Sequence, residues 1–198
     1  MSKGEATRER ILDWAFRSAS RRGLEGLSIG NLASELGLSK SGLFAHFGSK
    51  EELQVAVLAA ARERFVELVV RPALAARRGE PRMRKWFESW LRWTSDPTVP
   101  GGCVFMVAGV EFDDRDGRPR EFLVKSQREL LDSVAKSAAH AVECGDFRED
   151  LEPDQYAFEL LGIMLAYHQE KRLFRAPNAE KRARAAFERL LAAARRQS

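Results

Sequence analysis

The side chains that most often carry chemistry in proteins are few in this sequence and lie far apart. Asp113, Asp114 and Asp116 gather in one polar stretch and could bind a cation. They lack the ligand spacing of a calcium loop and have arginines among them, so a solvated turn is the better interpretation. His140 and His168 fall on separate predicted helices, and no spacing of histidine and cysteine matches a zinc site. We therefore predict no bound metal.

The sequence has two cysteines, Cys103 and Cys144. They are too few and too far apart for a disulfide framework or a zinc module, which favours a reducing compartment. Cys103 follows two glycines and is better explained as a small buried residue than as a redox sensor. Neither a glycine-rich phosphate loop nor a nucleophile elbow is present. We predict no enzymatic activity and no cofactor.

The amino-acid composition is typical of a globular protein with a hydrophobic core. Of its 198 residues, 44% are hydrophobic and 31% charged, and the net charge of +4 permits an anionic partner without requiring one. The first ten residues lack the apolar segment of an export signal. The most apolar run, residues 157–167, is far shorter than the ~20 residues that a membrane span needs. We expect a cytoplasmic protein.

Three serines define the elements around residues 28–53. Ser28 and Ser39 can each accept a hydrogen bond from a backbone N–H one turn on, and the helices that they begin end at Gly37 and Gly48. Ser49 begins a third and much longer helix. Helices as short as the first two are marginal in isolation, so this stretch predicts a compact helix-turn-helix supported by longer helices.

Helical spacing indicates which face of these short helices is buried. The predicted apolar stripe is Ile29, Leu32, Leu36, Leu43, Phe44 and Phe47. A preceding helix, capped by Thr7, carries a similar stripe and ends at Gly23. Residues 1–52 form the smaller of two predicted domains.

Residues 53–198 form the larger predicted domain, and no part of the chain shows the alternation of a strand, so we predict an all-α fold. The helix begun at Ser49 keeps its apolar spacing to Val70, and Pro72 should kink or end it. The helix after Pro81 contains Trp86, Trp90 and Trp93, for which core packing is favoured over ligand contact.

The last two predicted helices indicate a partner subunit. The segment 157–167 is apolar nearly all round, so it must be buried on more than one face. Asn178 caps a final helix with one apolar stripe. Pairing of both helices with their symmetry mates would make a four-helix interface. The expected interface residues are Leu160, Leu161, Met164, Tyr167, Phe187 and Leu190.

The stretch LSIGNLASELGLSKSGLFAHFGSKEEL, from Leu27 to Leu53, resembles the DNA-binding segment of the TetR family of bacterial transcriptional regulators. The close resemblance covers residues 7–53, and the rest is similar only in general architecture. It implies an all-helical homodimer with one DNA-binding head per subunit. It also implies a cavity in the larger domain, where a small-molecule effector binds and releases a double-stranded DNA operator.

The resemblance assigns roles to residues at matching positions. The matched DNA-binding residues are Ser28, Ser39, Lys40, Ser41, Gly42, Phe44, His46 and Lys50. Those at 40–42 correspond to the base-reading positions, and the serines at 28 and 39, the histidine and Lys50 to phosphate contacts. His46 could equally be solvated. The family usually has glycine where Ser41 stands and tyrosine where Phe44 stands, so we assign Phe44 to core packing first.

The family's cavity lies about where Trp86, Trp90, Trp93, Cys103, Phe105 and Met106 fall, so some of these residues are expected to line it. The functional hypothesis is a ligand-responsive repressor that binds a palindromic operator as a homodimer. One alternative is a helical small-molecule-binding protein or enzyme whose head is only structural. Another is a regulator that responds to a protein partner or to oxidation of Cys103.

Overall fold

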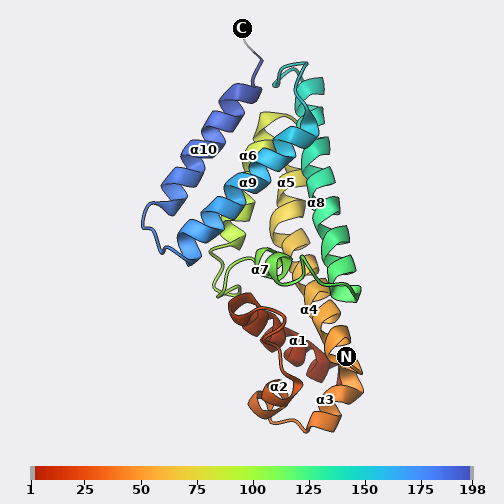
Figure 1. Ribbon diagram of the computed structural model, residues 1–198. Coiled ribbons are helices and arrows are strands. Elements are labelled where there is room, and N and C mark those ends of the chain that lie inside the picture. Colours follow the sequence, from red (N-terminus) through yellow and green to blue (C-terminus); the bar gives the residue numbers. More distant parts are fainter. Residues whose placement is uncertain (1–2, 197–198) are drawn as a thin grey trace. The chain divides into compact units, whose positions relative to one another are not determined.

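The computed structural model describes residues 3–196, which fold into helices joined by short connections (Figure 1). Between residues 3 and 196 there is no strand, only an isolated bridge between Phe147 and Arg195, which confirms the all-α prediction. The helices are α1 (Lys3–Arg22), α2 (Ile29–Leu36), α3 (Lys40–Phe47), α4 (Lys50–Phe65), the π-helical η1 (Val66–Val70), α5 (Arg71–Ala75), α6 (Glu80–Trp93), α7 (Val104–Glu111), α8 (Arg118–Glu143), α9 (Pro153–Arg172) and α10 (Ala179–Ala194). Within the described range, no helix is both long enough and apolar enough to span a membrane.

The chain divides into two compact units, each built from two segments. The first contains residues 3–64 and 96–125, and the second contains residues 65–95 and 126–196. The predicted domains, 1–52 and 53–198, were each one continuous segment. In the structure, residues 96–125 belong with the helix-turn-helix because α7 packs on α1.

Helix α1 begins at Lys3, so Thr7 lies inside it and does not cap it, contrary to the prediction.

The end of α1 shows how the two segments of the first unit are joined. The helix ends at Gly23, where φ is +78° and a Cβ would lie 1.6 Å from a carboxylate oxygen of Glu111. That carboxylate accepts a hydrogen bond from the backbone N–H of Leu24 at 2.7 Å. Glycine is therefore required at position 23 both for its backbone conformation and for the approach of α7.

Pro72 does not end the helical path begun at Ser49. The helix passes into the π-helical turn η1, in which the N–H of Arg71 bonds to the carbonyl of Val66, and α5 then carries the helix to Ala75. Proline has no N–H and clashes with the carbonyl four residues earlier in an α-helix. The π turn η1 directly before Pro72 widens the helix there and accommodates this clash.

The second unit is built around the aromatic face of α6. Trp86, Trp90 and Trp93 are all at most 2% exposed. The indole N–H of Trp86 donates to the hydroxyl of Ser137 on α8 at 3.0 Å. Phe65 meets the rings of Trp90 and Trp93 edge-on, with centroids 5.8 and 5.4 Å away. These contacts confirm that the tryptophans pack in the core.

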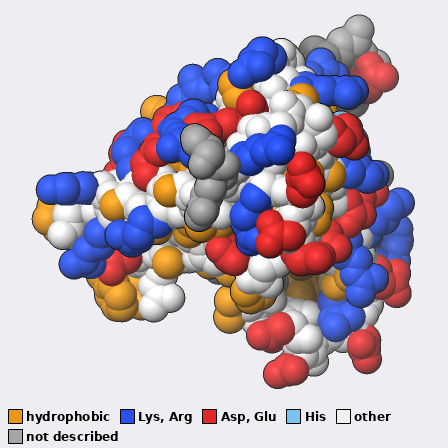
Figure 2. Space-filling view, turned by 90° about the horizontal axis from the view of Figure 1, so that it is seen from above, with side chains coloured by type: hydrophobic (Ala, Val, Ile, Leu, Met, Phe, Trp, Pro, Cys, Tyr) orange, Lys and Arg blue, Asp and Glu red, His pale blue; other side chains and the backbone are white. Residues whose placement is uncertain are grey.

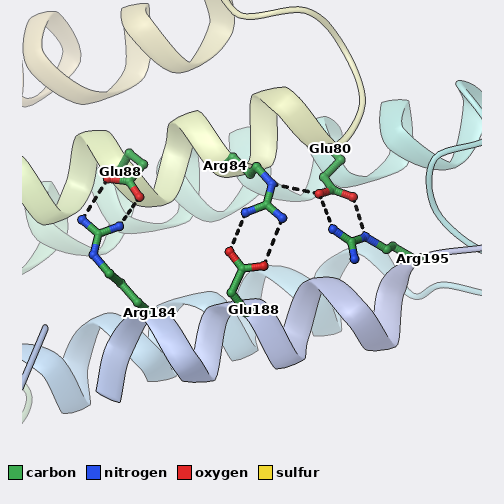
Figure 3. A network of polar contacts seen from close by, with 6 residues as sticks. All are labelled: Glu80, Arg84, Glu88, Arg184, Glu188 and Arg195. Carbon is green, nitrogen blue, oxygen red and sulfur yellow. Dashed lines mark hydrogen bonds and ion pairs between the residues drawn. The ribbon is translucent and has the colours of Figure 1, made fainter. Parts of the chain in front are cut away.

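A ring stack and a row of ion pairs join α6 to α10. Phe87 stacks on Phe187 with centroids 4.1 Å apart and planes 10° from parallel. Beside the stack, six charged side chains from the two helices face one another (Figure 3). They are Glu80, Arg84 and Glu88 of α6 with Arg184, Glu188 and Arg195 of α10 and its C-cap. On the face seen in Figure 2, acidic and basic side chains are likewise interspersed.

Arg84 is central to this row. Its guanidinium bonds to Glu80 at 2.8 Å and to Glu188 through two N–H groups, one of them at 3.0 Å. Arg195 donates to both carboxylate oxygens of Glu80, at 2.7 and 2.8 Å, and shares Oε1 with Arg84. The Arg195 hydrogen bond lowers the pKa of Glu80, and the Arg84 hydrogen bond lowers the pKa of Glu188. Both carboxylates are therefore ionised at neutral pH.

We expect Arg84→Gln to lower the free energy of unfolding at pH 7 by about 1 kcal/mol, the size of a good partly exposed ion pair. The two carboxyl pKa values are lower in the folded state than their ordinary value of 4.5, so this contribution is present above pH 4.5 and disappears as the pH falls through the folded-state values. Urea unfolding followed by tryptophan fluorescence between pH 7 and pH 3 measures this. Arg92→Gln, on the same helix without an ion pair among the described residues, is the control. A loss that did not depend on pH would contradict the electrostatic explanation.

Candidate functional site

The helix-turn-helix contains the three serine caps that the sequence predicts. The hydroxyl of Ser28 accepts from the N–H of Asn31 at 3.2 Å, and that of Ser39 accepts from Gly42 at 3.0 Å. Ser49 accepts from the N–H of Glu52 at 3.1 Å. The two glycines that follow α2 and α3 have φ of +65° and +71°. Each short helix therefore has its first and last turns specified locally.

Only one stripe of α3 reaches the core. Leu43 is fully buried and Phe47 is 7% exposed, with the guanidinium of Arg8 on α1 lying 5.2 Å above its ring. Phe44 is 45% exposed, so its assignment to the core is wrong. Successive residues are 100° apart around a helix, and an eight-residue helix can bury the stripe through Leu43 and Phe47 without reaching Phe44.

The outer face of α3 carries a cation, a hydroxyl and an aromatic ring. Lys40, Ser41 and Phe44 are exposed, and Gly42 is half-buried. The hydroxyls of Ser39 and Ser41 are 3.1 Å apart. A Cβ at Gly42 would lie 3.1 Å from the hydroxyl of Ser39, so a larger residue would crowd the cap. This face does not pack against the rest of the head, and an exposed α-helix fits the width of the DNA major groove.

Lys50, although partly exposed, is hydrogen-bonded to a residue of its own chain. Its ammonium donates to the backbone carbonyl of Glu25 at 3.0 Å and to the Glu25 carboxylate at 3.2 Å. The same carboxylate also accepts from Gln54 at 3.0 Å and pairs with Arg115 at 3.0 Å. Burial raises the pKa of Glu25, but these three hydrogen bonds more than offset it, so the pKa lies below its usual value. Nothing in the local sequence around Lys50 indicates this partner, which lies 25 positions away.

The polar loop before α8 is tied to the helix-turn-helix by its arginines. Arg115 reaches Glu25, and Arg118 pairs with Glu52 while its backbone N–H donates to Glu51 at 3.0 Å. The three aspartates of the loop are exposed. Within residues 3–196, no group of three or more histidine, cysteine or acidic side chains is placed to hold a metal ion.

The six residues expected near a ligand cavity are all buried but fall in different units. Trp86, Trp90 and Trp93 belong to the second, and Cys103, Phe105 and Met106 to the first; their exposed fractions run from 0 to 8%. The indole N–H of Trp86 has a hydrogen-bond acceptor in the hydroxyl of Ser137. The indole N–H of Trp90, in contrast, is buried and has no hydrogen-bond partner within the described chain.

The residues expected at a dimer interface lie mostly inside their own subunit. Leu160, Met164, Tyr167, Phe187 and Leu190 are at most 9% exposed, because α9 and α10 pack on each other and on α6. Leu161 is half-buried. The apolar residues of α9 that reach the surface are Phe158 and Leu165, at 67% and 46% exposure. Sequence alone does not tell which side of an all-apolar helix packs inside.

Two family models match the chain. The model for bacterial regulatory proteins of the tetR family matches residues 11–57, the region of the helix-turn-helix. The model for the tetracyclin repressor-like C-terminal domain matches residues 79–187, which is more than half of the chain. The chain belongs to the TetR family. A search of curated protein sequences found no match.

Several solved structures share the fold. A TetR transcriptional regulator from Chloroflexus aurantiacus J-10-FL is 22% identical, with a TM-score of 0.86 over 97% of this chain and 96% of that one. AibR in complex with isovaleryl coenzyme A and operator DNA is 23% identical, with a TM-score of 0.76 over 93% and 97%. A putative regulator from Saccharomonospora viridis in complex with choline is 19% identical, with a TM-score of 0.83 over 98% and 100%.

The exposure of Phe44 is testable against its buried neighbour. We expect Phe44→Ala to change the free energy of unfolding by no more than about 0.5 kcal/mol, as for an ordinary surface position. Phe47→Ala should lower it by about 3 kcal/mol, because the change leaves a cavity in the core of the head. Urea unfolding followed by circular dichroism measures both. Equal losses would show that Phe44 is part of the core.

Proposed function

We propose that this TetR-family protein is a ligand-responsive repressor that binds a palindromic DNA operator as a homodimer and dissociates when a small-molecule effector binds. The observation that carries the proposal is the outer face of α3, where Lys40, Ser41 and Phe44 are exposed on a short helix held by two caps and a buried stripe. The matching family models cover both halves of such a regulator.

The exposed groups suit distinct parts of DNA. Lys40 can donate to the acceptor edge of guanine or to a phosphate, and Ser41 can donate or accept. The hydroxyl of Ser28 uses only a lone pair in capping and keeps its proton for a phosphate oxygen, and that of Ser39 does so when Ser41 is the donor of the bond between the two hydroxyls. Phe44 has no hydroxyl, and its exposed ring is suited to the methyl group of thymine.

A homodimer would place two such helices in successive major grooves, about 34 Å or a small multiple apart. The surface that supports this is a groove of about 720 Å³ along α9 and α10. Small residues, including Gly162, Ala166 and Ala186, line it and would let a second helix pair approach closely. Phe158 and Leu165 add exposed apolar area on α9. A second copy of the chain is the partner that we propose for this surface.

An effector would bind in the second unit or beside it. The unpaired indole N–H of Trp90 supports this, since buried polar groups normally have a partner. Two structures that share the fold hold small molecules, isovaleryl coenzyme A in AibR and choline in the Saccharomonospora viridis protein. Effector and operator would then oppose each other thermodynamically.

The proposal is tested by binding of DNA taken from beside the protein's own gene. Fluorescence anisotropy at rising salt should give saturable binding whose affinity falls with salt, with two chains per site by analytical ultracentrifugation. No binding at low salt would leave the alternative of a helical binding protein or enzyme with a structural head.

We expect Lys40→Ala to weaken operator binding about tenfold, the loss of one base or phosphate contact. Lys136→Ala, which removes an exposed lysine of α8, serves as the control for net charge. If the two variants bound the operator equally well, Lys40 would not contact DNA.

We expect Glu25→Gln to strengthen operator binding several-fold, because the substitution removes the negative charge that pairs with Lys50 and leaves the backbone carbonyl of residue 25 and a neutral amide to compete with a phosphate for its ammonium. The slope of log affinity against log salt should steepen by about one ion. The matched control is Glu35→Gln, an exposed glutamate of α2. An unchanged salt slope would show that Lys50 stays away from DNA.

A further inference from the structure

The carboxyl end of α9 brings together polar groups that the DNA-binding role does not use. The ammonium of Lys171 lies 3.1 Å from the hydroxyl of Tyr167, one turn earlier on the same helix. It also donates to the hydroxyl of Ser95, just after α6. The hydroxyls of Ser95 and Tyr167 are 3.5 Å apart. Three polar side chains from two helix ends therefore meet at one point.

The charge of Lys171 is not neutralised there. Lys171 forms no ion pair within residues 3–196, although it is half-buried. The neighbouring carboxylate of Glu170 is held by Arg182 through two contacts of 2.8 Å. Asp96, next to Ser95, accepts instead from the backbone and hydroxyl of Thr98. The carbonyl end of α9 favours a cation at this position, but no counter-ion accompanies it.

His168 adds an unsatisfied group on the same side of the helix. Its Nε2 is buried and has no hydrogen-bond partner in the described chain. Positions 168, 171 and 172 are three and four residues apart, so they share one face. Burial lowers the pKa of His168, and the charges of Arg172 and Lys171 lower it further. The local potential is positive even with the imidazole neutral.

Some of the hydrogen-bond donors in this cluster have partners within the protein, and others can bind a ligand. Lys171 has three N–H groups, of which two are directed to Ser95 and Tyr167. Ser95 gives its own proton to the carbonyl of Leu91 at 3.1 Å, so it positions Lys171 and does not donate outward. Tyr167 accepts from Lys171, and because the proton of Ser95 goes to Leu91, the phenol is the donor in its 3.5 Å contact with Ser95. One ammonium N–H remains for an acceptor, the phenol O–H can exchange its long contact with Ser95 for a stronger acceptor, and His168 donates through Nε2 in its Nε2–H tautomer.

We propose that Lys171, Tyr167 and His168 form a binding site for the anionic group of a small ligand, a carboxylate or a phosphate. Anionic oxygens are the acceptors that match three neutral or cationic donors without a counter-ion, and such charge-assisted bonds are the strong ones. The inference rests on the proposed function, for which it names the chemical class of the effector: an acid or a phosphate ester.

Isothermal titration calorimetry tests the site with two probes, potassium phosphate and potassium acetate, each against potassium chloride at equal ionic strength. We expect saturable binding of at least one probe. Lys171→Met should raise its dissociation constant about tenfold, the loss of one charged hydrogen bond. Tyr167→Phe, which keeps the buried ring, should raise it several-fold, and Lys171→Arg should retain most of the affinity.

Lys136→Met, with the same change in charge, is the control and should bind as the parent does. Saturation by phosphate alone would assign a phosphate-bearing effector, and saturation by acetate alone a carboxylate. Absence of saturable binding, or equal constants in all variants, would overturn the site. Operator binding without added anion is measured on the same proteins and should be unchanged in Lys171→Met. DNA binding that persists without an anion site rejects this inference alone, whereas absent DNA binding rejects the proposed function.

Discussion

The position of α3, the helix that we propose reads DNA, depends on contacts made by only a few buried side chains. The helices α2 and α3 have eight residues each, and helices of that length are not stable alone in water. Their caps satisfy the first N–H groups, but their placement comes from the burial of Leu32, Leu43 and Phe47, with α2 packed on α1 and α3 packed on α2. Because so little of α3 is needed for this core, most of its surface remains available to a ligand as large as DNA.

A single carboxylate organises the polar side of the first unit. Glu25 receives Lys50 and Gln54 from α4 and Arg115 from the loop before α8. Together with the bond from Leu24 to Glu111, this attaches residues 96–125 to the helix-turn-helix. A change in that segment would therefore reach Lys50 through one shared acceptor.

The second unit is held differently, by aromatic packing inside and by ion pairs at its edge. The stack of Phe87 on Phe187 and the row around Arg84 hold α10 against α6. This leaves a groove along α9 and α10 open, lined mostly by small and apolar residues with charged ones among them. Within residues 3–196, Lys171 near the end of α9 has no ion pair, because the carboxylate of Glu170 is held by Arg182. Helical spacing brings the hydroxyl of Tyr167 to Lys171, and the packing of the second unit adds Ser95.

Local signals in the sequence determined the elements of this protein. Serine caps, glycine stops and helical spacing predicted α2 and α3 to the residue, because each of these features acts within one turn. They also predicted the aromatic core face of α6. The exposure of Phe44 was missed because the periodicity of an eight-residue helix does not show how wide a stripe will be buried.

Only the tertiary structure decided which residues far apart in sequence share a site. It paired Lys50 with Glu25, buried five of the six expected interface residues within the subunit, and joined residues 96–125 to the head. It also brought Ser95 to Tyr167 and Lys171 across 72 and 76 positions. Such pairings depend on how helices pack in three dimensions, and helical periodicity carries no information about them.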